Sequence, residues 1–330
     1  MIERTDRHVS SGSLPAAAVV GQLLDEAHRR FRDVTDGRPS SVYPALARAD
    51  PALFGICVAG VTGQVLTAGD SDTAFPIMSV AKPFTFALVC DAIGPDAARR
   101  ALGANATGLP FNSVEAVERS DGGRTNPLVN SGAIATIDLV PGADHAARWE
   151  MIRDGLSRFA GRDLALDDET YASASGTNHR NRAIAQLLES LGALSRDPAE
   201  TVDLYTRQSC LAVTARDLAV MGATLADGGV SPHTGVRVVS AESCRYALTV
   251  MTTAGLYETS GDWLYQVGLP GKSGIGGGIV AVSPGKGGLG TFSPPLDEAG
   301  NSVRGQLVAA YLSSRLGLDI FASAVHDQGS

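Results

Sequence analysis

A serine and a lysine lie three residues apart in an apolar segment, FPIMSVAKPFTFALV, which spans residues 75–89. Serine is a weak nucleophile until a base takes its proton, and a lysine that has lost its hydration can have a pKa low enough to act as that base. Residues three apart on a helix lie side by side, so the SxxK spacing of Ser79 and Lys82 allows a nucleophile and its base. The alternative is that Ser79 caps a helix and Lys82 extends its amine into solvent.

The rarity of lysine strengthens the first interpretation. Of 27 basic residues only three are lysine, namely Lys82, Lys272 and Lys286. Arginine keeps its proton in proteins, whereas a desolvated lysine can lose it. Pro83 has no N–H to donate to the carbonyl of residue 79, which predicts that Ser79 lies in the first turn of the helix, near the positive end of its dipole.

A glycine-rich segment, GKSGIGGG, begins at Gly271. It is not a phosphate-binding loop, because the first glycine of GxxxxGK[ST] would fall at Gln266 and a strand rather than a helix is expected to follow. It also opens no helix, as a dinucleotide-binding fingerprint must. Two interpretations stay open: the glycines allow a neighbouring backbone to pack closely, or Lys272, Ser273 and Gly274 line a cleft from an edge strand.

Apolar periodicity predicts the elements that must position these residues. The sequence indicates a helix at each end of the chain and strands next to each of them, with helical patterns from about residue 79 to residue 227. The predicted terminal elements are a helix at residues 15–32, two strands in LFGICVAGVTGQVLTAG, two strands in GIVAVSP and LGTFSP, and a helix near residues 302–316.

This order predicts a single interleaved domain over residues 1–330, of α/β (α+β) class. We expect an antiparallel sheet flanked by helices in one lobe, made by about residues 1–75 and 265–330. An inserted helical lobe would span about residues 76–264. The cleft between the lobes is the expected site.

Two helices in the middle of the chain carry specific signals. The segment HRNRAIAQLLESLG predicts a helix whose buried face holds Ile184, Leu187, Leu188 and Leu191. Asn181 lies three residues before Ile184, so it also points inward, either as a capping or hydrogen-bonded core residue or as a ligand for an amide. Further on, the spacing of Thr214 and Asp217 predicts a capping box.

Composition excludes several classes of function. The chain is 44% hydrophobic and 19% charged, and its net charge of −8 gives no basic field to bind nucleic acid or an anionic membrane. The polar N-terminus lacks the apolar core of a signal peptide, and no apolar run reaches the roughly 18 residues of a membrane span. We therefore expect a soluble cytoplasmic protein.

Cysteines and histidines indicate no metal or cofactor. The four cysteines are far apart among apolar neighbours, as expected for buried free thiols, and no histidine pair has HxxxH or HExxH spacing. These cysteines are Cys57, Cys90, Cys210 and Cys244.

Taken in order, many segments resemble the serine-dependent glutaminases, a family with the fold of β-lactamases and penicillin-binding proteins. The resemblance covers about residues 42–305, nearly the whole enzyme domain. The segments that carry it are FPIMSVAK, GLPFNS, NPLVNSGAI, HRNRAIA, LYTRQSCLAVTARDLA, MTTAGLYETSGDW, VGLPGKSGIGGGI and SPPLDEAGNSVRG.

The resemblance implies a mechanism in which the side-chain amide of L-glutamine is hydrolysed to L-glutamate and ammonia. Ser79 would be the nucleophile and Lys82 its base, and Tyr257 would pass a proton to departing ammonia. Water would then hydrolyse the glutamyl-enzyme. Lys272 would match the strand lysine of the wider fold.

The resemblance also implies the binding residues. The N–H groups of Ser79 and Ile275 would form the oxyanion hole, with isoleucine where the family usually has valine. Asn130, Asn181 and Tyr205 would hold the substrate. No cofactor is implied, and the family suggests a homodimer or homotetramer.

Three departures fall on positions that recognise substrate. Ala174 replaces the family glutamate that binds the α-amino group, a contact worth roughly 1.5 to 3 kcal/mol. Met78 replaces a glutamine, and Val42 replaces a cleft tyrosine, although Tyr43 is adjacent. A glutaminase with altered recognition is therefore expected.

Three alternatives stay open. They are an amidohydrolase acting on another γ-amide, such as an N-acylated or peptidyl glutamine, a β-lactam-hydrolysing or penicillin-binding enzyme, and a catalytically silent ligand-binding homologue.

Overall fold

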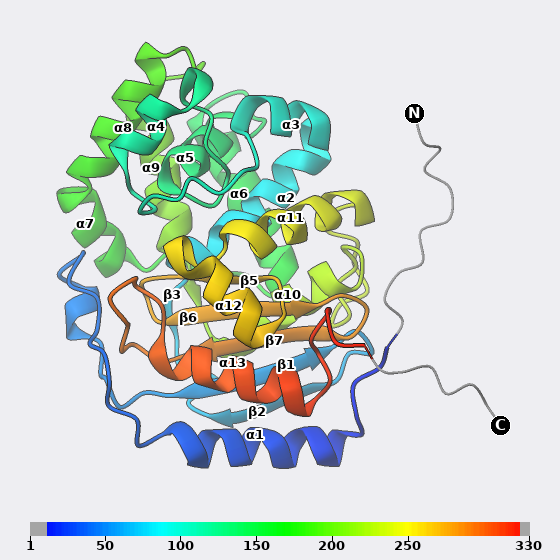
Figure 1. The fold of residues 1–330 in the computed structure, drawn as a ribbon. Coiled ribbons are helices and arrows are strands. Elements are labelled where there is room, and N and C mark those ends of the chain that lie inside the picture. Colours follow the sequence, from blue (N-terminus) through cyan, green and yellow to red (C-terminus); the bar gives the residue numbers. More distant parts are fainter. Residues whose placement is uncertain (1–11, 324–330) are drawn as a thin grey trace.

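A five-stranded antiparallel sheet lies at the centre of the molecule, with helices on both faces (Figure 1). The computed structural model describes residues 12–323 of the chain. The strand order is β2-β1-β7-β6-β5, and β3 and β4 form a separate two-stranded sheet. The strands are β1 Gly55–Gly60, β2 Val65–Gly69, β3 Phe75–Pro76, β4 Ala212–Val213, β5 Gly271–Ser273, β6 Gly278–Ser283 and β7 Gly287–Phe292.

The helices account for most of the chain between β3 and β5. Among residues 12–323, none is long and apolar enough to cross a membrane. The helices are α1 Ala17–Phe31, α2 Lys82–Ile93, α3 Pro95–Leu102, α4 Val114–Arg119, α5 Asn130–Asp138, α6 His145–Ala160, α7 Asp168–Thr177, α8 His179–Ser190, α9 Pro198–Ser209, α10 Ala215–Ala226, α11 Ala241–Ala254, α12 Ser260–Val267 and α13 Val303–Arg315.

The two ends of the chain build the sheet and cover one of its faces. Strands β1 and β2 come from residues 55–69, and β5 to β7 come from residues 271–292. Figure 1 shows α1 and α13 together on one side of the sheet, and both contact it and each other. The terminal helices and strands predicted from the sequence are therefore confirmed.

Helix α1 forms because its apolar residues recur with helical spacing. Val20, Leu23, Leu24 and Ala27 are buried, at positions i, i+3, i+4 and i+7. Burial of the larger side chains contributes roughly 1.5 to 3 kcal/mol each. This face fixes α1 against β1 and β2.

Helix α10 covers the opposite face of the sheet, although it comes from the middle of the chain. Strand β7 allows this because Gly288 and Gly290 face the helix backbone. A Cβ at Gly290 would lie 2.1 Å from the carbonyl oxygen of Ala215, so only glycine fits. The predicted capping box of Thr214 and Asp217 is present at the start of α10.

One hydrophobic core joins the helices to the sheet. Phe84 of α2, Ile134 of α5, Val280 of β6 and Phe292 of β7 all belong to it. Helix α2 is buried around nearly its whole circumference, which is typical of a helix at the centre of a large core. The four cysteines are buried free thiols, as predicted.

One predicted core position is wrong. Leu191 was expected on the buried face of α8, but this helix ends at Ser190 and Leu191 is 44% exposed. The apolar periodicity continues one residue past the point where the helix itself stops. Asn181, in contrast, is buried as predicted.

Candidate active site

Ser79 lies in a short 3-10 turn, Met78–Ala81, that leads directly into α2. The backbone N–H of Lys82 donates to the carbonyl of Ser79, and Pro83 follows as the next helical residue. Met78 has a φ of 50°, in the left-handed region that non-glycine residues rarely adopt. Such a conformation is often found at functional sites, and here it sets the direction in which the nucleophile turn begins.

Lys82 is buried with only neutral partners. Its side chain is 2% exposed, and Nζ donates to Oδ1 of Asn130 at 2.7 Å and to the carbonyl oxygen of Leu128 at 3.3 Å. Burial lowers the pKa of this amine to about 7. Much of the amine is therefore unprotonated at neutral pH and can accept a proton.

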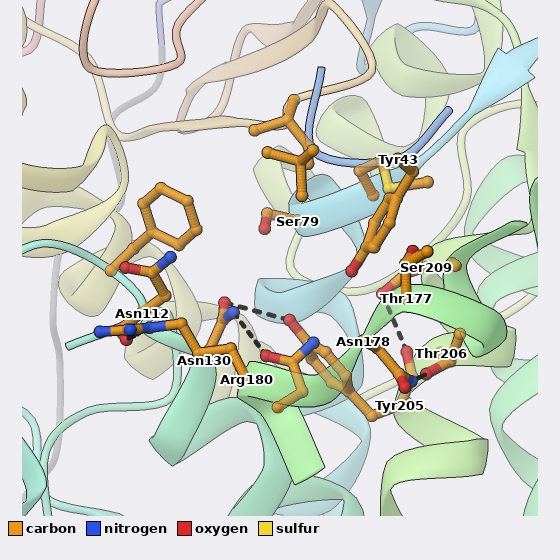
Figure 2. Close-up of a pocket in the computed structure, with 16 residues that line it drawn as sticks. Tyr43, Ser79, Asn112, Asn130, Thr177, Asn178, Arg180, Tyr205, Thr206 and Ser209 are labelled. Atoms are coloured by element: carbon orange, nitrogen blue, oxygen red, sulfur yellow. Dashed lines mark hydrogen bonds between the residues drawn. The ribbon is translucent and has the colours of Figure 1, made fainter. Parts of the chain in front are cut away.

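Asn130 accepts a hydrogen bond from Lys82 and also contacts two other predicted site residues, and Figure 2 shows its bond with Tyr205. Its Oδ1 also accepts from the hydroxyl of Tyr205 at 3.1 Å, while its Nδ2 donates to Oδ1 of Asn181 at 2.9 Å. Because Lys82 and Tyr205 are the donors, the amide orientation of Asn130 is fixed. Helices α2, α5, α8 and α9 thus bring these four side chains into one network.

Tyr257 lies at the start of the 3-10 turn Tyr257–Thr259, and its φ of 56° is also left-handed. Burial raises the pKa of its hydroxyl to about 12, and a hydrogen bond with Ser79 opposes that rise. The hydroxyl donates to the carbonyl oxygen of Ser273 at 3.3 Å, and the ring of Phe111 lies 4.5 Å from the tyrosine ring. Tyr257 is therefore a protonated donor next to Ser79 at neutral pH.

The glycine-rich segment packs against the nucleophile turn. A Cβ at Gly274 would lie 3.2 Å from the backbone nitrogen of Ser79. Lys272 is fully buried, donates to the carbonyl oxygens of Gly255 and Ser273, and has Nζ 4.3 Å from the centroid of the Tyr257 ring. Burial, and next the charge of Lys82, lower its pKa. The glycines of GKSGIGGG thus allow close packing against a neighbouring backbone, which is the first of the two interpretations.

A cavity opens beside Ser79 and reaches most of the predicted site residues. Ser79, Asn130, Asn181, Tyr205 and Ile275 all line it, whereas Lys272, Ser273 and Gly274 do not. The other lining residues are Val42, Tyr43, Met78, Phe111, Asn112, Ala174, Thr177, Asn178, Arg180, Thr206 and Ser209. The three departures predicted to affect recognition, at Val42, Met78 and Ala174, are therefore all in the cavity wall.

The sequence did not single out seven of these lining residues. Asn178 and Arg180 carry a usable signal, since Asn178 is the N-cap of α8 and Arg180 lies in its first turn beside Asn181. Phe111 and Asn112 come from a loop, and Thr177, Thr206 and Ser209 from helices with no local functional pattern. Tyr43 lies close to Asn181, and burial raises its pKa to about 12 while a hydrogen bond to Asn181 opposes the rise.

Two backbone N–H groups beside the cavity have no acceptor. Among residues 12–323, neither Ser79 nor Ile275 donates its backbone N–H to another group. Unpaired N–H groups of this kind can stabilise an oxyanion. In the same part of the chain, no group of three or more His, Cys, Asp or Glu side chains can hold a metal ion.

The architecture and the site define a class of protein. An antiparallel sheet between helices, with a serine and lysine at the start of a buried helix, is the β-lactamase-like fold predicted from the sequence. A family model described as Glutaminase matches residues 37–321. The chain belongs to the glutaminase family and is an enzyme of that family.

Individual relatives agree with this assignment. Glutaminase 2 of Yersinia pestis is 63% identical over 316 residues, which cover 96% of this chain and 93% of that protein. A glutaminase of Brucella canis is 52% identical over 91% of this chain and 95% of its own length.

Solved structures give the same result. That of the probable glutaminase ybaS has a TM-score of 0.92 and 45% identity, covering 94% of this chain and all of its own. The crystal structure of Mglu in its glutamate form has a TM-score of 0.87 and 38% identity, covering 92% of this chain and 70% of its own.

Proposed function

We propose that this protein hydrolyses the side-chain amide of L-glutamine to L-glutamate and ammonia through an acyl-enzyme on Ser79. The observation that carries this proposal is the buried amine of Lys82, one turn from Ser79, whose pKa burial lowers to about 7. Membership of the glutaminase family supports the choice of substrate.

In the first half of the proposed reaction, the unprotonated amine of Lys82 takes the proton of Ser79 Oγ. That oxygen attacks the amide carbon, and the N–H groups of Ser79 and Ile275 hold the negative charge that develops on the carbonyl oxygen. The C–N bond then breaks. Tyr257 donates its hydroxyl proton to the leaving nitrogen and is reprotonated from Lys82, so ammonia departs and the glutamyl ester stays on Ser79.

In the second half, Lys82 takes a proton from water, and the hydroxide formed attacks the ester carbon. The C–O bond to Ser79 breaks, and Ser79 Oγ recovers a proton from Lys82. Each cycle consumes one glutamine and one water, and it leaves the enzyme unchanged.

We assign substrate binding to Asn130, Asn181 and Tyr205, which are buried in the cavity wall and linked to Lys82 by hydrogen bonds. At Ala174 the wall carries a methyl group. The α-amino group of glutamine therefore has no carboxylate partner there, and we propose that this group is held weakly.

The experiment that tests the function measures ammonia released from L-glutamine by the wild type and by Ser79→Ala. We expect kcat to fall by about 1000-fold or more, because the nucleophile is lost. Ser190→Ala, at the exposed end of α8, is the matched control and should keep wild-type activity. A Ser79→Ala protein that keeps more than about a tenth of the rate would overturn the mechanism.

We further propose a cytoplasmic homodimer or homotetramer that binds neither nucleic acid nor membrane. The net charge of −8 supports the last part, because anionic partners would be repelled. Light scattering of the eluting protein measures the oligomeric state, and a monomer at micromolar concentration would contradict the proposal.

A further inference from the structure

The cavity beside Ser79 carries one formal charge. Among its lining residues, which belong to the described part of the chain, there is no aspartate, glutamate or lysine, and Arg180 is the one charged side chain. Free glutamine is a zwitterion, so its carboxylate would meet a guanidinium while its ammonium would meet only neutral groups. The cavity wall therefore offers an opposite charge to the carboxylate of glutamine but none to its ammonium group.

Arg180 is held in place but has no anion to pair with. It is the second residue of α8, and its Nε donates to the carbonyl oxygen of Asn112 at 2.7 Å. Figure 2 shows its guanidinium beside Asn112, on the side of the cavity away from Tyr43 and Ser209. Within residues 12–323 Arg180 forms no ion pair. Its terminal nitrogens are thus available, and a guanidinium matches a carboxylate with two parallel hydrogen bonds.

The opposite wall offers a neutral acceptor. Nδ2 of Asn178 donates to Oγ1 of Thr206 at 3.0 Å, and Thr206 donates its own hydroxyl proton to the carbonyl oxygen of Val202 at 2.7 Å. This chain of donors fixes the amide of Asn178, whose Oδ1 is buried and has no partner. A neutral oxygen can accept an N–H from an ammonium or from a secondary amide alike.

We propose that Arg180 binds the carboxylate of the substrate, and that the site selects γ-amides by this carboxylate and not by an α-ammonium group. This inference rests on the proposed function and defines its substrate class. The class is the γ-amides of five-carbon carboxylic acids whose α-nitrogen is free, acylated or absent. Glutamine, N-acetylglutamine and glutaramate, which has no α-nitrogen, are its simplest members.

The first test compares kcat/KM of the wild type for glutamine and glutaramate from ammonia release. Both keep the carboxylate and the γ-amide, so we expect the two values to agree within about tenfold. N-acetyl-L-glutamine should also be hydrolysed. A preference for glutamine over glutaramate of more than about tenfold would overturn the inference while leaving the glutaminase function intact.

Substitutions at Arg180 and at Ala174 test the two walls of the cavity separately. Arg180→Gln should lower kcat/KM by about 10- to 100-fold for all these amides, because one charge-assisted contact is lost, and Arg180→Lys should recover part of it. Ala174→Glu would add the missing carboxylate and should raise the glutamine-to-glutaramate ratio by about tenfold or more, whereas its uncharged match, Ala174→Gln, should not. An unchanged rate in Arg180→Gln would overturn the role of Arg180.

A binding experiment distinguishes a failure of this inference from a failure of the proposed function. In the Ser79→Ala background, glutarate, a dicarboxylate without an amino group, should bind by calorimetry, and adding Arg180→Gln should weaken it by about tenfold or more. Circular dichroism checks that both proteins are folded. Glutarate binding that depends on Arg180, together with a wild type that releases no ammonia from glutamine, N-acetylglutamine or glutaramate, would overturn the proposed function and keep the carboxylate site. Equal binding in both proteins would overturn the carboxylate site.

Discussion

At the scale of single residues, the environment of Lys82 decides its chemistry. Its hydrogen-bond partners are an amide oxygen and a carbonyl oxygen, and the nearest ring is that of Tyr205, 5.9 Å from Nζ. A nearby carboxylate would hold the proton on the amine, but no ion pair involves Lys82 within residues 12–323. Burial without an anion therefore favours the neutral amine, which is the form a general base needs.

The pH dependence of activity follows from the protonation state of Lys82. The base must be unprotonated, so kcat/KM should rise about tenfold per unit at low pH, bend near pH 7 and stay level above it. Tyr257 keeps its proton throughout, since burial raises its pKa to about 12. Rates measured from pH 5 to pH 9 check this, and a flat profile below pH 7 would contradict it.

The variant Lys82→Arg also tests whether Lys82 is the general base. A guanidinium cannot give up its proton, so activity should fall by about 100-fold or more at every pH in that range. Lys286→Arg, remote from the cavity, should behave as the wild type. Near-normal activity in Lys82→Arg would show that another group is the base.

At the scale of elements, strand β5 and the nucleophile turn must touch. Gly274→Ala would bring a methyl carbon to 3.0 Å from the carbonyl oxygen of Ile77 and 3.2 Å from the nitrogen of Ser79. We expect a loss in kcat of about tenfold or more, because the turn or the strand has to move, with an unfolding free energy lowered by only about 1 to 3 kcal/mol.

Gly21→Ala on α1 is the matched control for Gly274→Ala. A Cβ at Gly21 meets nothing within 4 Å, so this change should raise the free energy of unfolding by roughly 0.5 to 1 kcal/mol and leave kcat unchanged. Steady-state rates and urea unfolding measure both effects. An unchanged kcat in Gly274→Ala would show that this contact does not position Ser79.

The elements themselves were mostly predictable, because local patterns specify them. The α1 face, the capping box of α10 and the glycine-rich strand region can all be read from spacing. The docking of α10 on the sheet was not predictable, because it depends on glycines of β7 some 70 residues further along the chain. Leu191 was misplaced because periodicity does not mark where a helix ends.

The site was predictable to the extent that its residues lie in recognisable segments. Ser79, Lys82, Asn130, Asn181 and Tyr205 lie close together, although the 3-10 turn Met78–Ala81 and four helices supply them. The left-handed backbone of Met78 and Tyr257 and the position of Arg180 beside Asn112 are long-range outcomes of packing. No local pattern specifies them.

At the scale of the whole molecule, α10 lies between the sheet and helices α6 and α11, which in turn contact the site helices α2 and α9. Gly290→Ala would bring a Cβ to 2.1 Å from the carbonyl oxygen of Ala215, so α10 could no longer lie on β7. We expect the free energy of unfolding to fall by about 3 kcal/mol or more, and activity to be lost with it. Gly261→Ala, where a Cβ meets nothing within 4 Å, is the control.

Urea unfolding followed by circular dichroism checks this prediction. Gly290→Ala should unfold at a clearly lower urea concentration than the wild type, and Gly261→Ala should not. Equal midpoints for Gly290→Ala and the wild type would contradict the view that close packing of α10 on β7 stabilises the fold.

The most direct test of the acyl-enzyme on Ser79 is the mass of the intact protein, quenched by acid during turnover of glutamine. We expect a fraction of the enzyme to be heavier by one glutamyl group, which lies on the peptide that contains Ser79 and is absent from Ser79→Ala. Ammonia release with the glutamyl group on another residue, or undiminished release by Ser79→Ala, would contradict it.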